Sequence, residues 1–348
     1  MFARTLLLRT ASKALPPRAT RPTPPPRARA ASTRAFHNAM SSKQLIDATA
    51  AFVGAWGAGP GSEAKLRELL SPGVLFEPDG VVFRQELKGA DSVVAAMQRQ
   101  HGRLAHRRYD AVAVASNPEE RTAFAAVAWE YSDNNGEQGQ PSRGMSLKQL
   151  VFDDEGRICA TRVVRQMTQE EKKDLLSDPS ACHAADLWAE VLPRLEGGGS
   201  SAPAGGDEAA QHDKMMNALK TWDGAWGSDG CDASGLQAVC SPNLRVLDGY
   251  GLHGSGTSYG LKEAQEMVSS LRKKSESATS IVHLAVNPAA RVGFSRWEAN
   301  AAGKGDPGLG ADALVKLGGL DLALFDQEGR IELLVQFTMK QYPQLAIQ

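Results

Sequence analysis

The sequence predicts an α+β protein in which one domain is present twice. The first observation is internal similarity, because the run Ala55–Gly57 recurs 170 positions later as Ala225–Gly227. The second is the order of patterns, since each copy shows helical periodicity first and strand-like runs afterwards. We therefore expect the helices of each copy to pack on one face of a curved antiparallel sheet.

The similarity keeps its register over most of the copy. Four further residues recur at the same spacing of 170: Asn117, Pro118, Arg121 and Phe124 return as Asn287, Pro288, Arg291 and Phe294. The run Phe152–Ile158 returns as Phe325–Ile331, now 173 positions later. A constant register with one small slip indicates a duplicated domain with a loop insertion. Residues that differ between the copies are therefore not required by the fold.

The sequence divides into five segments. These are a transit peptide (1–40), a first domain (41–168), a helical extension (169–196), a Gly/Ser/Ala linker (197–210) and a second domain (211–345). The linker composition is typical of a flexible connection.

The first forty residues differ in composition from the rest. They hold eight Lys and Arg residues, six prolines and no Asp or Glu. A basic segment without acidic residues is typical of an organelle transit peptide, and the context Arg34–Phe36 favours the mitochondrial matrix over the plastid stroma. Without them, 31 basic residues face 40 acidic ones, which leaves a net charge of −9. This charge argues against a nucleic-acid partner, and no segment predicts a membrane span.

The first helix of copy one is predicted over Lys43–Trp56. Ser41, followed three residues later by Gln44, has the pattern of a capping box, and Gly57 marks the end of the helix. The remaining elements are a short helix (Glu63–Leu70), an extended stretch (Val74–Phe83), a third helix (Ala90 to about Leu104) and four strands (Tyr109–Ser116, Thr122–Tyr131, Met145–Phe152, Ile158–Met167).

Copy two is predicted to repeat this order from Asp213 to Tyr342. Between the copies, Thr168 and Glu171 have the spacing of a second capping box, and a helix containing Trp188 is expected to follow. Trp129 and Trp297 fall on the same face of corresponding strands once a gap of two residues is allowed, and we interpret them as packing residues.

The order of elements resembles the nuclear transport factor two-like superfamily, which includes SnoaL-like cyclases and ketosteroid isomerases. The Ala-Trp-Gly end of the first helix, Gly89 and Gly260 before the third helix, and the hairpin Phe-Asp-x-Glu-Gly-Arg-Ile carry the resemblance. It covers 43–168 and 211–345. It implies two tandem cone-shaped domains, each a curved antiparallel sheet wrapped around three helices with one pocket beneath them.

The resemblance to ketosteroid isomerases implies candidate catalytic residues. These enzymes place a protonated Asp four residues before the aromatic residue that precedes the last hairpin turn, and Asp321 lies four residues before Phe325. Lys148 occupies this place in copy one. In an apolar pocket a carboxyl group is held neutral and can donate a hydrogen bond to a developing enolate.

Two more positions follow from the same resemblance. The general base lies just before a Pro in the first strand, which matches Glu77, and Asp248 comes closest in copy two if one residue is inserted. The oxyanion Tyr of the first helix falls on Phe52 and Trp222. Trp56 and Trp226 stand at equivalent positions and are expected in the core or in the pocket wall. These four aromatic residues and Lys148 are the candidate ligand-binding residues.

Strand alternation leaves one question open for Asp321. Leu320, Leu322 and Leu324 lie on the opposite face of the same strand, and the sequence does not say which face is concave. The alternative to catalysis is that Asp321 and Lys148 are strand residues that face solvent or the other domain.

Two classes of function remain. One is a small-molecule isomerase, cyclase or dehydratase that moves a proton on a carbonyl-containing or apolar ligand, without a metal or cofactor, because the histidines lack metal-site spacing. The other is a non-catalytic ligand-binding or assembly module whose pockets are filled by side chains. Relatives of this fold dimerise through the backs of their sheets, so we expect an intramolecular pseudo-dimer or a homo-oligomer.

Overall fold

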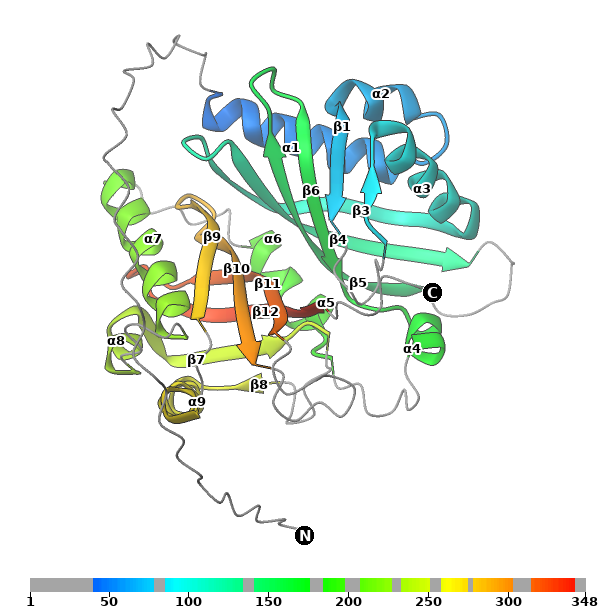
Figure 1. The fold of residues 1–348 in the computed structure, drawn as a ribbon. Coiled ribbons are helices and arrows are strands. Elements are labelled where there is room, and N and C mark those ends of the chain that lie inside the picture. The colour runs from blue at the N-terminus through cyan, green and yellow to red at the C-terminus, as the bar shows by residue number, and fades with distance from the viewer. Residues whose placement is uncertain are drawn as a thin grey trace, which may run out of the picture. The chain divides into compact units, whose positions relative to one another are not determined.

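The structure is a computed structural model that describes nine segments of the chain: 40–77, 85–133, 141–175, 184–197, 207–226, 233–250, 258–274, 278–302 and 314–341. These segments belong to one compact unit, Asn38–Gln348 (Figure 1). The predicted transit peptide, apart from Met40, and residues 198–206 of the predicted linker lie outside the described residues. No helix in the described segments is long and apolar enough to cross a membrane.

Copy one begins with its helices. Its elements in order are α1 (Ser42–Ala58), α2 (Glu63–Leu69), β1 (Leu70–Glu77), β2 (Leu87–Lys88), α3 (Ala90–Arg103), β3 (Leu104–Asn117), β4 (Thr122–Asp133), β5 (Ser142–Phe152) and β6 (Ile158–Arg165).

Copy two follows a short helical extension and repeats the same order. The extension contains α4 (Gln169–Leu175), α5 (Leu187–Glu190) and α6 (Leu192–Gly197). Copy two contains α7 (Glu208–Ala225), α8 (Ala233–Val239), β7 (Cys240–Asp248), β8 (Ser258–Tyr259), α9 (Leu261–Lys274), β9 (Ala278–Asn287), β10 (Val292–Ala302), β11 (Leu314–Phe325) and β12 (Ile331–Gln341).

The predicted capping signals are present. The Ser41 hydroxyl accepts a hydrogen bond from the Gln44 amide, and the Gln44 side chain accepts one from the Ser41 amide at 2.8 Å. Thr168 and Glu171 form the same reciprocal pair at 2.9 and 3.2 Å. Helix α1 continues past the predicted end at Gly57 and is capped by Gly59, whose φ of 76° is readily adopted only by glycine.

The repeated Phe-Asp-x-Glu-Gly-Arg-Ile motif forms the same hairpin turn twice. In each copy the Asp carboxylate accepts hydrogen bonds from the amides two and four residues later, at 3.0 and 2.9 Å for both Asp153 and Asp326. Gly156 and Gly329 both have a φ of 77°. The motif therefore builds the turn, and its recurrence reflects the fold.

The strands of the described segments form one twelve-stranded order, β2-β1-β6-β5-β4-β3-β9-β10-β11-β12-β7-β8. The second half of this order mirrors the first. The predicted α+β class is confirmed, but the sheet is mixed, because β1 runs parallel to β6 and β7 runs parallel to β12. The two halves meet where Ser116 of β3 pairs with Val286 of β9, and these two residues are themselves 170 positions apart.

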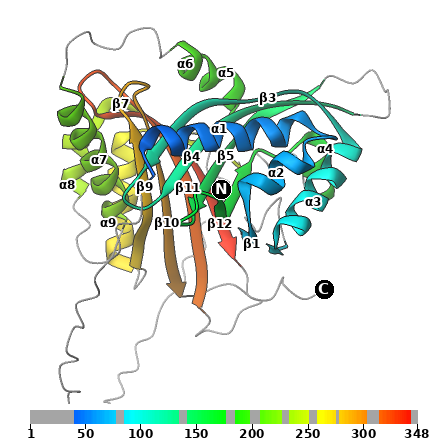
Figure 2. The same ribbon diagram turned by 90° about the horizontal axis from the view of Figure 1, so that it is seen from above.

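Each half of the sheet is covered on both faces. One face, here called the inner face, packs against the helices of its own copy, as the apolar clusters around α1 and α7 show (Figure 2). The opposite face, here called the rear face, packs against the rear face of the other copy. Leu187 of α5, Leu192 of α6 and Val191 between these helices belong to the same cluster.

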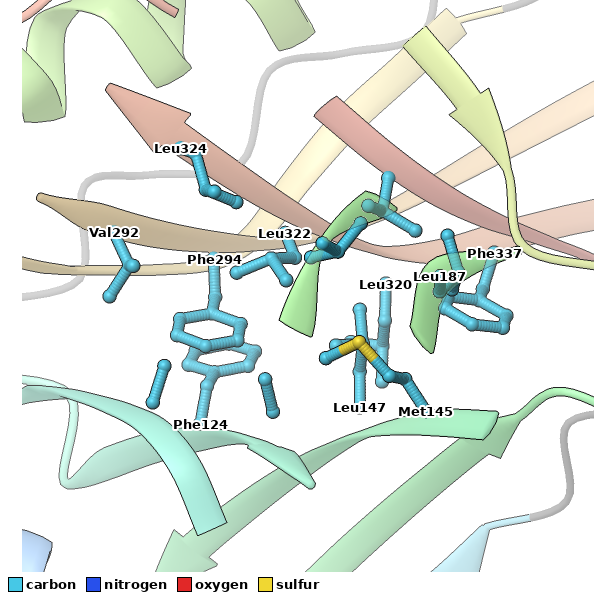
Figure 3. Close-up of a cluster of buried hydrophobic side chains, with 14 of the residues drawn as sticks. Phe124, Met145, Leu147, Leu187, Val292, Phe294, Leu320, Leu322, Leu324 and Phe337 are labelled. Atoms are coloured by element: carbon cyan, nitrogen blue, oxygen red, sulfur yellow. The ribbon is translucent and has the colours of Figure 1, made fainter. Parts of the chain in front are cut away.

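Equivalent residues meet across the rear faces (Figure 3). The rings of Phe124 and Phe294 stack with centroids 5.6 Å apart and an interplanar angle of 8°. The Asn117 side-chain amide donates to the Leu284 carbonyl at 3.0 Å, and the Asn287 amide donates to the Val114 carbonyl at 2.9 Å. These bonds are reciprocal, as they are in a two-fold symmetric dimer interface.

The stacked phenylalanines give a stability prediction. Phe294→Ala should lower the free energy of unfolding by about 3–5 kcal/mol, because it leaves a void between the two packed rear faces. Urea denaturation followed by circular dichroism measures this change. The control is Ile281→Ala, because Ile281 is 37% exposed and its loss should cost less than about 1 kcal/mol. A Phe294→Ala protein as stable as the control would contradict the packing described here.

Candidate active site

Asp321 lies on the inner face of β11, beneath the helices of copy two. Ala323 and Phe325, which share its strand parity, belong to the apolar cluster around α7. Leu320 and Leu322 lie on the rear face. The structure therefore answers the question that the alternation left open, because the carboxyl group faces the helices. Asp321 is only 1% exposed.

Three side chains form a hydrogen-bonded network around Asp321. The Trp297 indole N–H donates to Asp321 Oδ1 at 3.2 Å, and the Gln336 amide donates to Oδ2 at 3.3 Å. The Tyr259 hydroxyl in turn donates to Gln336 Oε1 at 2.9 Å. Burial raises the pKa of Asp321 to about 7, although both N–H donors act in the opposite direction.

A second carboxyl group, Asp223 of α7, lies in the same interior. Asp223 is 3% exposed, and its Oδ2 has no hydrogen-bond partner among the described residues. Burial and, second, the charge of Asp321 raise the pKa of Asp223 well above its usual range. Two neighbouring buried carboxyl groups do not both ionise readily. Because Asp321 accepts two N–H donors, it is the favoured carboxylate, and Asp223 holds the proton.

The indole of Trp297 can reach Asp321 because its cross-strand neighbour is glycine. Trp297 pairs with Gly319, and a Cβ at Gly319 would lie 2.5 Å from the indole nitrogen and 2.4 Å from Cε2. These distances are shorter than any normal contact, so a larger residue would push the ring aside. Gly319, which lies two residues before Asp321, therefore leaves room for the indole to lie flat against the sheet.

Asp248 lies at the edge of the same cluster of polar side chains. It ends β7 opposite Gln336, and its Oδ1 accepts a hydrogen bond from the Tyr250 amide at 2.9 Å. Burial raises the pKa of Tyr259, and the charges of Asp321 and Asp248 add to this effect. Asp248 thus shares a neighbour with Asp321, but its carboxylate is engaged in capping a turn.

Trp222 and Trp226 form part of the apolar wall of this interior. Their ring centroids are 5.6 Å apart at an angle of 62°, and Trp222 is fully buried. The Trp222 indole nitrogen has no hydrogen-bond partner in the described segments. Both residues therefore pack edge to face against each other in the apolar wall, and their role in ligand binding stays a prediction.

Glu77 does not face the interior, which removes it as the predicted general base. Its Oε2 accepts a hydrogen bond from Arg162 Nε at 2.8 Å and lies 3.0 Å from Nη2 of Arg296, a residue of copy two. Arg162 has the strand parity of Val164, which belongs to the rear-face cluster. A carboxylate between two rear-face arginines joins the copies and is separated from the interior by the sheet.

Copy one has a different interior. Lys148 is fully buried, with its Nζ 5.3 Å from the Trp56 ring centroid and 5.2 Å from that of Tyr109. Burial and, second, the charge of Arg165 lower the pKa of Lys148 to about 7. Phe52 and Trp56 are buried with ring centroids 5.8 Å apart. Trp56 therefore lies beside the Lys148 amine, and Phe52 packs against Trp56.

Sequence reasoning missed four residues of copy two: Asp223, Tyr259, Trp297 and Gln336. A comparison of the copies could have identified two of them. Asp223 stands where copy one has Val53, and Gln336 stands where it has Val163, at offsets of 170 and 173. Trp297 was interpreted as a packing residue, but its N–H is a donor to Asp321.

The described residues contain no cluster of three His, Cys, Asp or Glu side chains that could hold a metal ion. The polar groups around Asp321 and Asp223 are carboxyl, amide, phenol and indole groups, together with the hydroxyl of Ser295, which pairs with Asp321 across the strands. This set can bind a small polar ligand atom and move a proton.

No protein-family model and no curated protein matches this sequence. Solved structures match parts of it. A protein assigned as a SnoaL-like polyketide cyclase from Jannaschia sp. CCS1 is 17% identical and covers 38% of this chain and 91% of its own, with a TM-score of 0.30. A protein assigned as an isomerase from Bacillus subtilis is 16% identical over 38% and 92%, with a TM-score of 0.31.

A further match is an epoxide hydrolase of the LEH-like type from M. tuberculosis, which is 16% identical over 44% of this chain and 98% of its own, with a TM-score of 0.28. These similarities concern the fold alone. Each covers less than half of this chain.

The buried carboxyl group gives a pH prediction. Because the pKa of Asp321 is raised from 3.8 to about 7 on folding, the native state binds the proton more tightly, and this group destabilises the fold increasingly as pH rises from 4 to 7. Asp321→Asn lacks this effect. The difference in melting temperature between variant and wild type should therefore grow in favour of the variant from pH 4 to 7. A constant difference would show that Asp321 titrates normally.

Proposed function

We propose that copy two is a metal-free proton-transfer enzyme of the isomerase, cyclase or dehydratase type that acts on a small carbonyl compound. One observation carries the proposal: Asp223 and Asp321 lie in one apolar interior, and among the described residues two N–H donors reach Asp321 while Asp223 Oδ2 has no partner. Such a pair provides a neutral acid and a carboxylate at the same pH. The solved structures similar in fold include proteins assigned as an isomerase and a cyclase.

The roles follow from the hydrogen bonds. The Asp321 carboxylate removes a proton from the carbon next to the carbonyl, and protonated Asp223 donates a hydrogen bond to the oxygen that becomes the enolate. Asp321 then returns the proton to the γ carbon, so the double bond moves and no atom is lost. This assignment reverses the role that the resemblance implied for Asp321, because its two N–H donors favour the charged form.

The remaining side chains hold the base in place. Trp297 and Gln336 each fix one carboxylate oxygen, and Tyr259 orients the Gln336 amide. The same first step, loss of a proton next to a carbonyl, begins an isomerisation, a cyclisation or a dehydration.

The test is the conversion of cyclohex-3-enone to cyclohex-2-enone, followed by the absorbance of the conjugated product. Wild type should catalyse it with a rate that rises with pH through about 7 as Asp321 ionises. Asp321→Asn and Asp223→Asn should each lower kcat/KM by at least about 100-fold. Asp47→Asn, a change of an exposed carboxylate on α1, should have no effect.

A matched pair of glycine variants extends this test. Gly319→Ala displaces the Trp297 indole and should lower kcat at pH 8, because Asp321 loses a donor that stabilises the carboxylate. Gly144→Ala makes the same change in copy one, where a Cβ would lie 2.6 Å from the Trp129 ring. Equal activity of the two variants would contradict the role given to Trp297.

The alternative is a non-catalytic ligand-binding or assembly module. The edge-to-face packing of Trp222 and Trp226 favours it, because these rings occupy part of the interior of copy two. Absence of turnover by folded wild type with cyclohex-3-enone and with other enolisable ketones would reject the enzyme and leave this alternative.

We also propose that residues 1–40 direct the chain to the mitochondrial matrix, on the basis of their basic and acid-free composition. A fluorescent protein fused behind residues 1–40 should enter mitochondria, and the chain that starts at residue 41 should not. A fusion found in plastids or left in the cytosol would reject this localisation.

A further inference from the structure

We propose that the interior of copy one is a second ligand site, which binds a small organic carboxylate with a flat apolar body. The site is built from Lys148 and Ser146 of β5, Trp129 of β4, and the aromatic rings of Trp56 and Tyr109. It does not depend on the proposed activity of copy two.

Three buried hydrogen-bond donors in the described part of this interior lack an acceptor. Lys148 Nζ, Trp129 Nε1 and Ser146 Oγ are buried and have no hydrogen-bond partner among the described residues. Each such group costs free energy unless an acceptor is supplied. The three side chains share one face, because Lys148 and Ser146 are two residues apart on β5 and Trp129 pairs with Gly144, two residues before Ser146. A carboxylate on this face is the type of acceptor that these donors lack.

The interior of copy two has a similar tryptophan, but there an acceptor is present. In both copies a tryptophan lies over a glycine of the neighbouring strand: Trp297 over Gly319, and Trp129 over Gly144. In copy two the indole N–H donates to the carboxylate of Asp321. In copy one the equivalent of Asp321 is Lys148, a donor, and the tryptophan lies over a glycine four residues before Lys148, whereas Gly319 lies two residues before Asp321. A bound carboxylate would supply what the substitution removed.

The charge of Lys148 is not balanced by a neighbouring carboxylate among the described residues. The charged group that acts on Lys148 is Arg165, which is also a cation. Arg165 donates to Glu171 at 2.7 Å, so its charge is already paired, while the described residues pair no carboxylate with Lys148. The other titratable groups packed around this interior are His101, Tyr109 and Tyr131. A monoanion is therefore the ligand that balances the site.

The aromatic rings indicate the shape and polarity of the rest of the ligand. Trp56 and Tyr109 flank the Lys148 amine, and Trp56 also stacks on Phe76 with centroids 6.2 Å apart. Such walls favour a flat apolar group attached to the carboxylate.

Isothermal titration calorimetry with acetate, benzoate and trans-cinnamate tests the proposal. Benzoate and cinnamate should bind wild type more tightly than acetate does, and benzamide, the neutral counterpart of benzoate, should bind more weakly. Lys148→Met should weaken benzoate binding by at least about tenfold, the expected loss for one charge-assisted hydrogen bond. Ser146→Ala keeps the amine and should weaken binding less.

Proton uptake separates this role from a structural one. The Lys148 amine has a pKa of about 7 without ligand, and a bound carboxylate raises it, so wild type should take up protons when benzoate binds at pH 8. Titrations in buffers of different ionisation enthalpy measure this uptake. It should vanish in Lys148→Met and persist in Lys43→Met, because Lys43 is exposed and paired with Asp47.

Lys148→Met should fold, because it replaces a buried amine by an apolar side chain of similar length, and a melting curve checks this. Equal benzoate affinity in folded Lys148→Met and wild type would overturn the proposal. Failure of folded wild type to bind any of the three carboxylates would overturn it as well, whatever copy two does with ketones.

Discussion

The packing of the two rear faces is the contact on which the rest of the structure depends. Each half of the sheet is apolar on both sides, and its own helices cover only one of them. The second copy covers the other, with Phe124 on Phe294 and the reciprocal bonds of Asn117 and Asn287 at the centre. Because each copy covers the rear face of the other, duplication supplies within one chain the partner that a single domain would need from a second molecule.

This packing also decides the surroundings of every polar strand residue. On β11 the leucines contact the other copy, and Asp321 is turned toward α7. Glu77 falls on the rear face, where Arg162 and Arg296 pair with it. The rear-face carboxylate of Glu77 therefore joins the copies, whereas Asp321 on the inner face is desolvated, which raises its pKa to about 7.

The two interiors are built from the same helices and strands but contain ionisable side chains of opposite sign. Copy two contains the carboxyl groups of Asp223 and Asp321, where copy one has Val53 and Lys148. The tryptophan over glycine is retained in both. Since the fold tolerates either set, these positions are free to diverge in chemistry between the two copies.

The sequence by itself determined the duplication, the order of helices and strands, both capping boxes and the repeated hairpin turn, because these depend on local spacing and local hydrogen bonds. It also pointed to Asp321. It could not place Asp223 beside Asp321, turn Trp297 toward it or put Glu77 on the rear face. These placements depend on which sheet face each helix covers and on strands that are distant in the chain, and only the tertiary structure decides them.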